Sequence, residues 1–110
     1  MAIQSTAIGT SNTDLYVSSG NTAVTCIWVC NTATYNPADP TNGLTYLDIH
    51  FVKQGAGITS TNLIVNQLAV PAGETVTFDT EKIILDNGDR VVASSASPAN
   101  LVATVSTIDV

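Results

Sequence analysis

Positively charged side chains are nearly missing from this chain. Its 110 residues include three Lys and Arg against nine Asp and Glu, which gives a net charge of −6 at pH 7. Proteins that bind nucleic acid draw much of their affinity from basic side chains that neutralise phosphates. The three basic residues, Lys53, Lys82 and Arg90, stand singly. We therefore expect no nucleic-acid partner and no attachment to an anionic membrane surface.

Long apolar runs are missing as well. No stretch approaches the ~20 apolar residues of a transmembrane helix. The first residues, Met1 to Ser5, lack both the positive region and the apolar region of a secretory signal peptide. We therefore expect a protein made in a cytoplasm, not exported by the usual route, and not inserted in a membrane.

Side chains suited to catalysis or to soft metals are scarce. The chain has two cysteines and one histidine. Cys26 and Cys30 fall in one apolar run, and in a strand their Cα atoms would lie about 13 Å apart, beyond the ~7 Å limit for a disulfide. We expect free thiols that act as small apolar side chains. Asp48 and His50 share a strand face without a placed nucleophile, so we expect no enzyme and no zinc site.

What the sequence does contain is β-branched residues and turn residues. From Leu63 to Val110, apolar residues alternate in short runs separated by turn signals, as in antiparallel strands. The turn at Val70–Gly73 combines Pro with Gly, and the turn at Asp86–Asp89 contains Asn-Gly, a strong hairpin signal. Ser97–Asn100 closes the last connection. The pattern predicts a β-meander in this half.

The first half adds further strands. They are expected at Asp14–Ser18, Thr22–Asn31 and Leu44–Lys53, and Ser19–Asn21 is expected to form a hairpin loop between the first two. Together the runs predict an all-β domain, a single antiparallel β-sandwich of about eight strands spanning residues 12–110. Strand order is not encoded in alternation, so immunoglobulin-like and jelly-roll topologies both stay open. Residues 1–11 are expected to form either an arm that orders on a partner or an edge strand.

Trp28 is the candidate anchor of the domain. Its strand is apolar on both faces, with Val24, Cys26 and Cys30 expected on the side of Trp28. A strand with one solvated face would alternate apolar with polar residues. One face therefore lies in the core and the other is covered or forms an interface; for Trp28 we favour the core. The apolar and aromatic residues named as interface candidates are Ile3, Ile8, Trp28, Tyr35 and Tyr46.

Calcium is the one cofactor that the sequence suggests. Four acidic residues, Asp79, Glu81, Asp86 and Asp89, crowd one region, and hard cations prefer oxygen ligands. The spacing of an EF-hand is absent, however, and hairpin turns require the same residue types. We therefore expect no cofactor.

Several segments resemble small virion proteins of tailed bacteriophages. The resemblance runs through LAVPAGE at Leu68–Glu74, KIILDNGDRV at Lys82–Val91, Ala93-Ser94-Ser95 and the closing Val105-Ser106, with an earlier Cys30-Asn31-Thr32. It covers about half of the chain, mostly Leu63 to Ser106. The resemblance implies a sandwich present in many copies on a phage particle, without catalytic residues.

Within that class the expectation is a capsid decoration (cement) protein in the virion, bound to the major capsid protein or other virion proteins. The expected form is a homo-oligomer, for example a trimer at a local three-fold axis, that would hold neighbouring capsomers together. The first alternative is a neck, tail or fibre-associated virion protein. The second is a soluble carbohydrate- or ligand-binding β-module, for which Trp28, Tyr16, Tyr35 and Tyr46 supply aromatic side chains.

Overall fold

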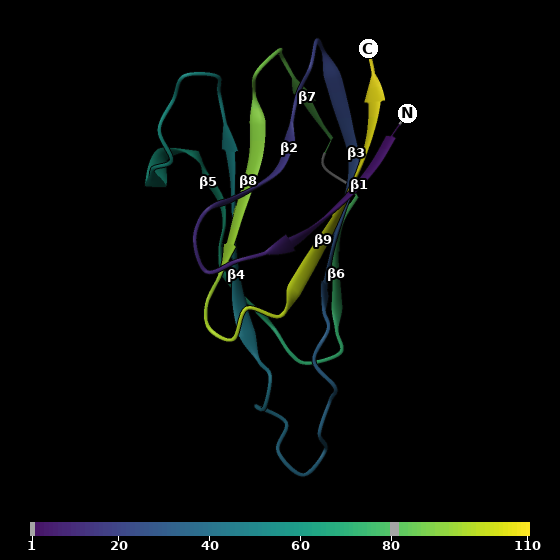
Figure 1. Cartoon of the computed structure of the whole chain (residues 1–110), viewed down its shortest axis with the longest axis vertical. Coiled ribbons are helices and arrows are strands. Elements are labelled where there is room, and N and C mark those ends of the chain that lie inside the picture. The colour runs from purple at the N-terminus through teal and green to yellow at the C-terminus, as the bar shows by residue number, and fades with distance from the viewer. Residues whose placement is uncertain (1, 80–81) are drawn as a thin grey trace.

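The computed structural model describes residues 2–79 and 82–110 (Figure 1). In these residues the chain forms strands joined by loops and one short 3-10 helix. The elements are β1 (Ala2–Ile8), β2 (Thr13–Val17), β3 (Thr22–Asn31), β4 (Thr45–Val52), η1 (Ser60–Asn62), β5 (Leu63–Val70), β6 (Thr75–Phe78), β7 (Ile83–Leu85), β8 (Arg90–Ser95) and β9 (Leu101–Asp109).

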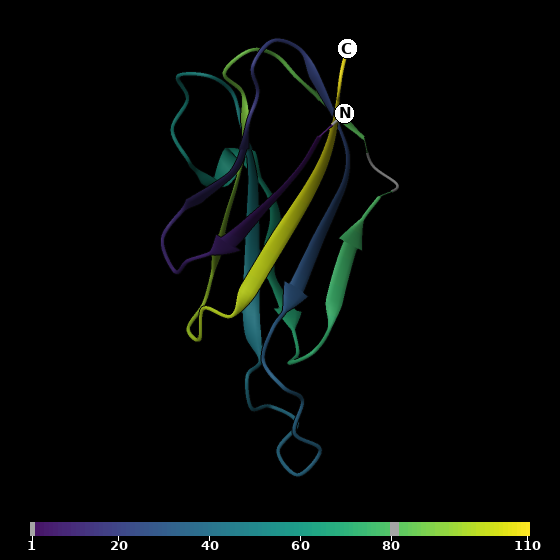
Figure 2. The same ribbon diagram turned by 45° about the vertical axis from the view of Figure 1, so that its right-hand side comes forward.

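The strands form two antiparallel sheets that lie face to face (Figures 1 and 2). Sheet A has the order β1-β9-β3-β6, with β7 also paired to β3, and sheet B has the order β2-β8-β4-β5. The inward side chains of both sheets form one apolar core, which includes Leu15, Val29, Leu47, Val91 and Val105. The predicted all-β antiparallel sandwich is confirmed.

The strand order is that of a jelly roll. β1 pairs with β9, β2 with β8, and β4 with β5, while β3 pairs with β6 through Ile27–Cys30 and with β7 through Thr22–Val24. β6 and β7 thus act as one interrupted strand. The first strand then pairs with the last, the second with the second-last, and so on inward along the chain, which is the pairing of a jelly roll. This decides between the two topologies that the sequence left open.

The predicted β-meander from Leu63 to Val110 is wrong. β5 and β8 belong to sheet B, whereas β6, β7 and β9 belong to sheet A, so in this half no described strand pairs with the next. The turn residues are correctly identified: the Asp89 N–H donates to the Asp86 carbonyl at 3.0 Å, with Gly88 at φ 86°. That turn carries the chain from sheet A to sheet B. The residues of a tight turn determine that the chain reverses direction, but they do not determine which strand the next segment pairs with.

The predicted Ser19–Asn21 hairpin is wrong for the same reason. β2 lies in sheet B and β3 in sheet A, so this loop also crosses from one sheet to the other. The Ser18 N–H and carbonyl bond instead to the Asp89 carbonyl and the Gly88 N–H, at 2.8 and 2.9 Å. Two crossing loops therefore brace each other at this end of the sandwich.

A β-bulge divides β3. The pairing of β3 with β9 shifts register between Val24 and Cys26. Val24 is consequently buried on the core side with Ile27 and Val29, while Cys26 lies on the opposite face with Trp28. The expected placement of Val24 on the face of Trp28 is wrong, because the extra residue at the bulge exchanges the two faces.

The N-terminal segment is an edge strand. β1 pairs with β9 from Ala2 opposite Thr107 to Ile8 opposite Leu101. Ile8 ends this strand in the core at 2% exposure. Of the two readings left open for residues 1–11, the structure shows the paired strand.

Candidate functional site

The outward surface of sheet A carries no charged side chain among the residues that define it. We call this surface the A face. Its members follow from the pairing registers, because partners across neighbouring strands share a face. They are Ile3, Ser5, Ala7, Ala23, Cys26, Trp28, Cys30, Thr75, Thr77, Ile84, Val102, Thr104, Ser106 and Ile108.

Hydroxyl groups on the A face are paired across its strands. Ser5 Oγ and Thr104 Oγ1 lie 3.1 Å apart. Thr25, at the β-bulge beside the A face, donates through Oγ1 to Ser106 Oγ at 3.0 Å and to the Ser106 carbonyl at 3.1 Å. A polar group that already has a protein partner loses less on leaving water than an unpaired one. These contacts lower the cost of covering the face with another protein.

Trp28 lies at the centre of the A face. Its register partners are Thr104 on β9 and Thr77 on β6, and it is 38% exposed. The expectation that Trp28 belongs to the core is wrong: β3 is apolar on both sides because one side builds the core and the other builds this face. A partly exposed Trp at the middle of a charge-free surface is typical of an interface anchor.

Isoleucines make one end of the A face apolar. Ile108 and Ile84 flank Ala23 on its two neighbouring strands, and Ile3 is the register partner of Ser106. Ile3 is 73% exposed, and Ile84 and Ile108 are also exposed. Both chain termini lie at this end (Figure 1). Exposed apolar side chains gathered in this way mark a contact surface more often than singly scattered ones.

Charges reach the A face at its rim. The Lys82 ammonium donates to the carbonyl of Thr25 at 2.9 Å and to the carbonyl of Asp79. Burial of Cys26, together with the Asp79 carboxylate, raises the pKa of the Cys26 thiol, and Lys82 acts in the opposite direction. Both cysteines are free thiols, as expected.

The structure separates the predicted interface residues. Ile3 and Trp28 share the A face, whereas Ile8 is buried in the core and is not available to a partner. Tyr35 is exposed in the loop between β3 and β4, and Tyr46 is exposed on the outward side of sheet B. Sequence reasoning missed the remaining A-face residues, because small Ser, Thr and Ala side chains give no signal alone.

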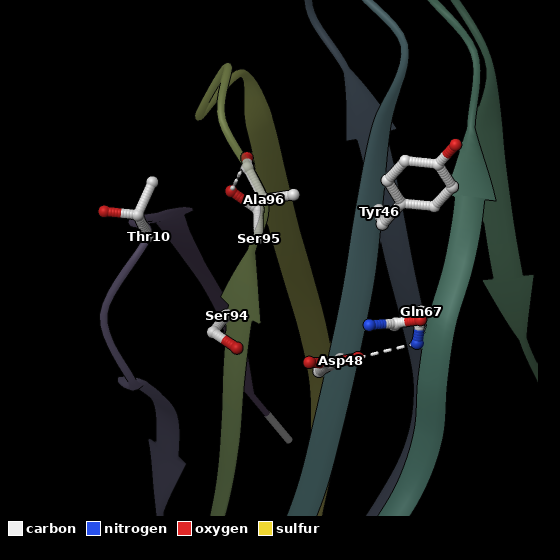
Figure 3. Close-up of a pocket in the computed structure, with 7 residues that line it drawn as sticks. All are labelled: Thr10, Tyr46, Asp48, Gln67, Ser94, Ser95 and Ala96. Carbon is white, nitrogen blue, oxygen red and sulfur yellow. Dashed lines mark hydrogen bonds between the residues drawn. The ribbon is translucent and has the colours of Figure 1, made fainter.

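The outward side of sheet B holds a polar pocket of about 340 Å³ (Figure 3). Its lining residues come from three strands and from the segments next to them: Thr10, Tyr46, Asp48, Gln67, Ser94, Ser95 and Ala96. Ser94 and Asp48 are register partners on β8 and β4, and the Gln67 N–H of β5 donates to Asp48 Oδ1 at 2.6 Å. Gln67 has a positive φ of 50°.

The acidic region considered for calcium is used for turn formation. Asp89 accepts backbone N–H groups from Gln54 and Asp86 on its two carboxylate oxygens, at 2.9 and 3.0 Å. Glu81 lies outside the described residues. Within residues 2–79 and 82–110, no group of three or more His, Cys, Asp or Glu side chains is placed to hold a metal ion.

His50, which the sequence places on one strand face with Asp48, is buried. It is 9% exposed, and its Nδ1 has no hydrogen-bond partner in the described part of the chain. Alternation along β4 places it on the outward side of sheet B, where η1 lies against β4. The two residues of this strand face therefore differ in hydrogen bonding: Asp48 accepts the Gln67 N–H, whereas His50 Nδ1 has no partner among the described residues.

Comparisons with protein-family models, with curated proteins and with solved structures found no match to this chain. Among the described residues, no helix has the length and hydropathy required to cross a bilayer.

Proposed function

We propose that this protein is a non-enzymatic structural protein of a bacteriophage virion, a capsid decoration protein that docks through the A face. The observation that carries the proposal is the charge-free A face with Trp28 at its centre. Water-exposed sheet faces normally carry polar and charged residues opposite the core. A face without charge is better suited to a protein partner, since the centres of interfaces are depleted in charged residues.

The energetics suit repeated attachment. Apolar burial contributes about 25 cal/mol per Å², so covering about 100 Å² of apolar surface around Trp28 stabilises a contact by about 2.5 kcal/mol. Stable interfaces cover about 800 Å² per partner, which requires most of a sheet face. On a particle the contact repeats at every symmetry-related position. The role is mechanical: each copy adds buried area across a joint between neighbouring capsid subunits.

Two further observations support the virion assignment. The sequence segments Leu68–Glu74 and Lys82–Val91 resemble those of small phage virion proteins. The strand order is that of a jelly roll, a fold found in viral capsid proteins and also in lectins and other proteins. The partner in this proposal is the major capsid protein, and copies of this chain form a homo-oligomer, with a trimer as the form that suits local three-fold axes.

The copy number per purified particle tests the proposal. Quantitative mass spectrometry against the major capsid protein is expected to give a count comparable with that of the capsid subunits. A small fixed count, equal to one ring or one set of fibres, would favour the alternative of a neck, tail or fibre-associated protein. Absence of the chain from washed particles would overturn the virion assignment itself.

A further inference from the structure

We propose that the polar pocket on sheet B is a binding site for a neutral saccharide. The pocket combines an exposed aromatic ring, a carboxylate, a carboxamide and hydroxyl groups on neighbouring strands (Figure 3). A sugar ring presents hydroxyl groups around its rim and C–H groups on its faces. It therefore requires both kinds of contact from one site, in contrast to a purely apolar or a purely ionic ligand.

The hydrogen-bonding part of the pocket is a row across three strands. Ser94 on β8 is the register partner of Asp48 on β4, and Gln67 on β5 lies on the other side of Asp48. Asp48 Oδ1 accepts the Gln67 N–H, and the Ser94 hydroxyl and the Gln67 carboxamide line the same pocket. Donors and acceptors are thus left for a ligand with several hydroxyl groups.

The backbone at Gln67 holds this row in place. A positive φ is uncommon for a residue other than glycine, and it costs of order 1–3 kcal/mol unless the surroundings stabilise it. Here the 2.6 Å hydrogen bond from the Gln67 N–H to Asp48 Oδ1 offsets that cost. The same bond orients the Asp48 carboxylate before any ligand arrives, and a site ordered in advance loses less entropy on binding.

Tyr46 supplies the surface for the face of the sugar ring. Its side chain is 44% exposed beside the row, and Figure 3 shows its ring on the side of β5. The backbone at Tyr46 is fixed, because its carbonyl accepts the Ala96 N–H at 3.0 Å. An aromatic ring with two rotatable bonds provides contact area at low entropic cost.

The negative charge of Asp48 limits the kind of ligand that the pocket can bind. Asp48 is the one ionisable acidic or basic group among the lining residues apart from the Tyr46 phenol. A carboxylate repels anionic sugars such as uronates, and it accepts hydrogen bonds well from neutral hydroxyl groups. The ligand class is therefore a neutral saccharide.

The pocket and the A face lie on opposite sides of the sandwich. Pocket residues belong to the outward side of sheet B, and Trp28 belongs to the outward side of sheet A. A copy that docks through the A face would leave the pocket open. The saccharide proposal does not depend on the docking proposal, because it rests on other residues.

The test is an NMR titration of the full chain with methyl glycosides of glucose, galactose and N-acetylglucosamine, with glucuronate as the anionic control. We expect at least one neutral glycoside to shift the backbone amides of Tyr46, Gln67 and Ser94 with a Kd of about 1 mM. Tyr46→Ala is expected to weaken that binding at least about tenfold. Tyr35→Ala, which removes an exposed tyrosine elsewhere, is the matched control.

Asp48→Asn separates binding from folding. The asparagine keeps an oxygen for the Gln67 N–H and removes the charge, so the fold is retained. We expect weaker binding of the neutral glycoside and loss of the discrimination against glucuronate. If none of the neutral glycosides shifts the pocket amides, or if the shifts persist at full affinity in Tyr46→Ala, the proposal is wrong. Equal binding of glucuronate and the neutral glycosides by the unchanged protein would also overturn it.

Discussion

The Asn31 side chain ties the end of β3 in sheet A to the end of β5 in sheet B. Its Nδ2 donates to the carbonyl of Val70 at 2.9 Å and to the carbonyl of Gly43 at 2.8 Å, and its Oδ1 accepts the Ala33 N–H at 2.9 Å. Asn31 is almost fully buried. One carboxamide therefore holds two sheets and the long β3–β4 loop together.

Replacing Asn31 with Ala is expected to destabilise the fold by about 3 kcal/mol. The substitution removes three hydrogen bonds. The Gly43 carbonyl keeps a donor in Asn100 Nδ2 at 3.1 Å, whereas the Val70 carbonyl loses its buried side-chain donor, and a buried unsatisfied group costs about 1–3 kcal/mol. Urea unfolding measures the change. Thr32→Ala, next along the chain and more exposed, is the control with a loss below about 1 kcal/mol. Equal losses for the two variants would contradict the role of Asn31.

Position 43 requires glycine both for its backbone conformation and for the lack of space around it. It has φ 83°, and a Cβ there would lie 2.8 Å from Ala33 Cβ and 3.1 Å from Ala72 Cβ. Gly20 has φ 75° with open space around it. Both Gly→Ala variants carry the backbone cost of a positive φ, of order 1 kcal/mol, and Gly43→Ala adds a steric clash. We expect the thermal midpoint of Gly43→Ala to fall well below that of Gly20→Ala; the reverse order would show that the loop adjusts freely.

The raised pKa of Cys26 predicts a specific pH dependence. Burial and Asp79 keep the thiol neutral in the folded protein to a higher pH than in the unfolded chain, where its pKa is about 8.5. The stabilisation is complete below about pH 8.5 and is lost as the pH rises through the folded pKa. The stability difference between the unchanged protein and Cys26→Ala, from urea unfolding, should therefore shrink above about pH 8.5. A difference constant from pH 7 to 10 would contradict this assignment.

Trp28→Ala distinguishes a surface anchor from a core residue. Because one side of the ring is already in water, its removal leaves no closed cavity. We expect a loss of at most about 2 kcal/mol, compared with ~3–5 kcal/mol for a buried aromatic residue. Val29→Ala, the next residue and fully buried, is expected to cost more per atom removed. A loss of the core magnitude for Trp28→Ala would count against an exposed docking role.

Local strand signals were readable from the sequence. The strand expected at Thr22–Asn31 coincides with β3, and Leu44–Lys53 exceeds β4 by one residue at each end. Alternation and turn residues report where a chain is extended and where it bends. They do not report which strands pair, so the jelly-roll order could not be obtained and the β-meander was wrong.

The candidate sites were only partly predictable. Trp28 stood out as an anchor, but its face was assigned wrongly, because the bulge between Val24 and Cys26 leaves no mark in the sequence. The A face depends on serines and threonines brought together from separate strands, and the pocket depends on the pairing of Ser94 with Asp48. Such sites arise from long-range register, which local patterns do not contain.

One charge placed on the A face tests the proposed docking of this face on the particle most directly. Thr77 is exposed beside Trp28, and Asn66 is exposed on β5 of the other sheet. Purified Thr77→Lys and Asn66→Lys proteins would be added to particles lacking this protein, and the bound copies counted. We predict that Thr77→Lys lowers occupancy at least about tenfold, because a desolvated unpaired charge is costly, whereas Asn66→Lys binds normally. Normal occupancy by Thr77→Lys would contradict docking through the A face.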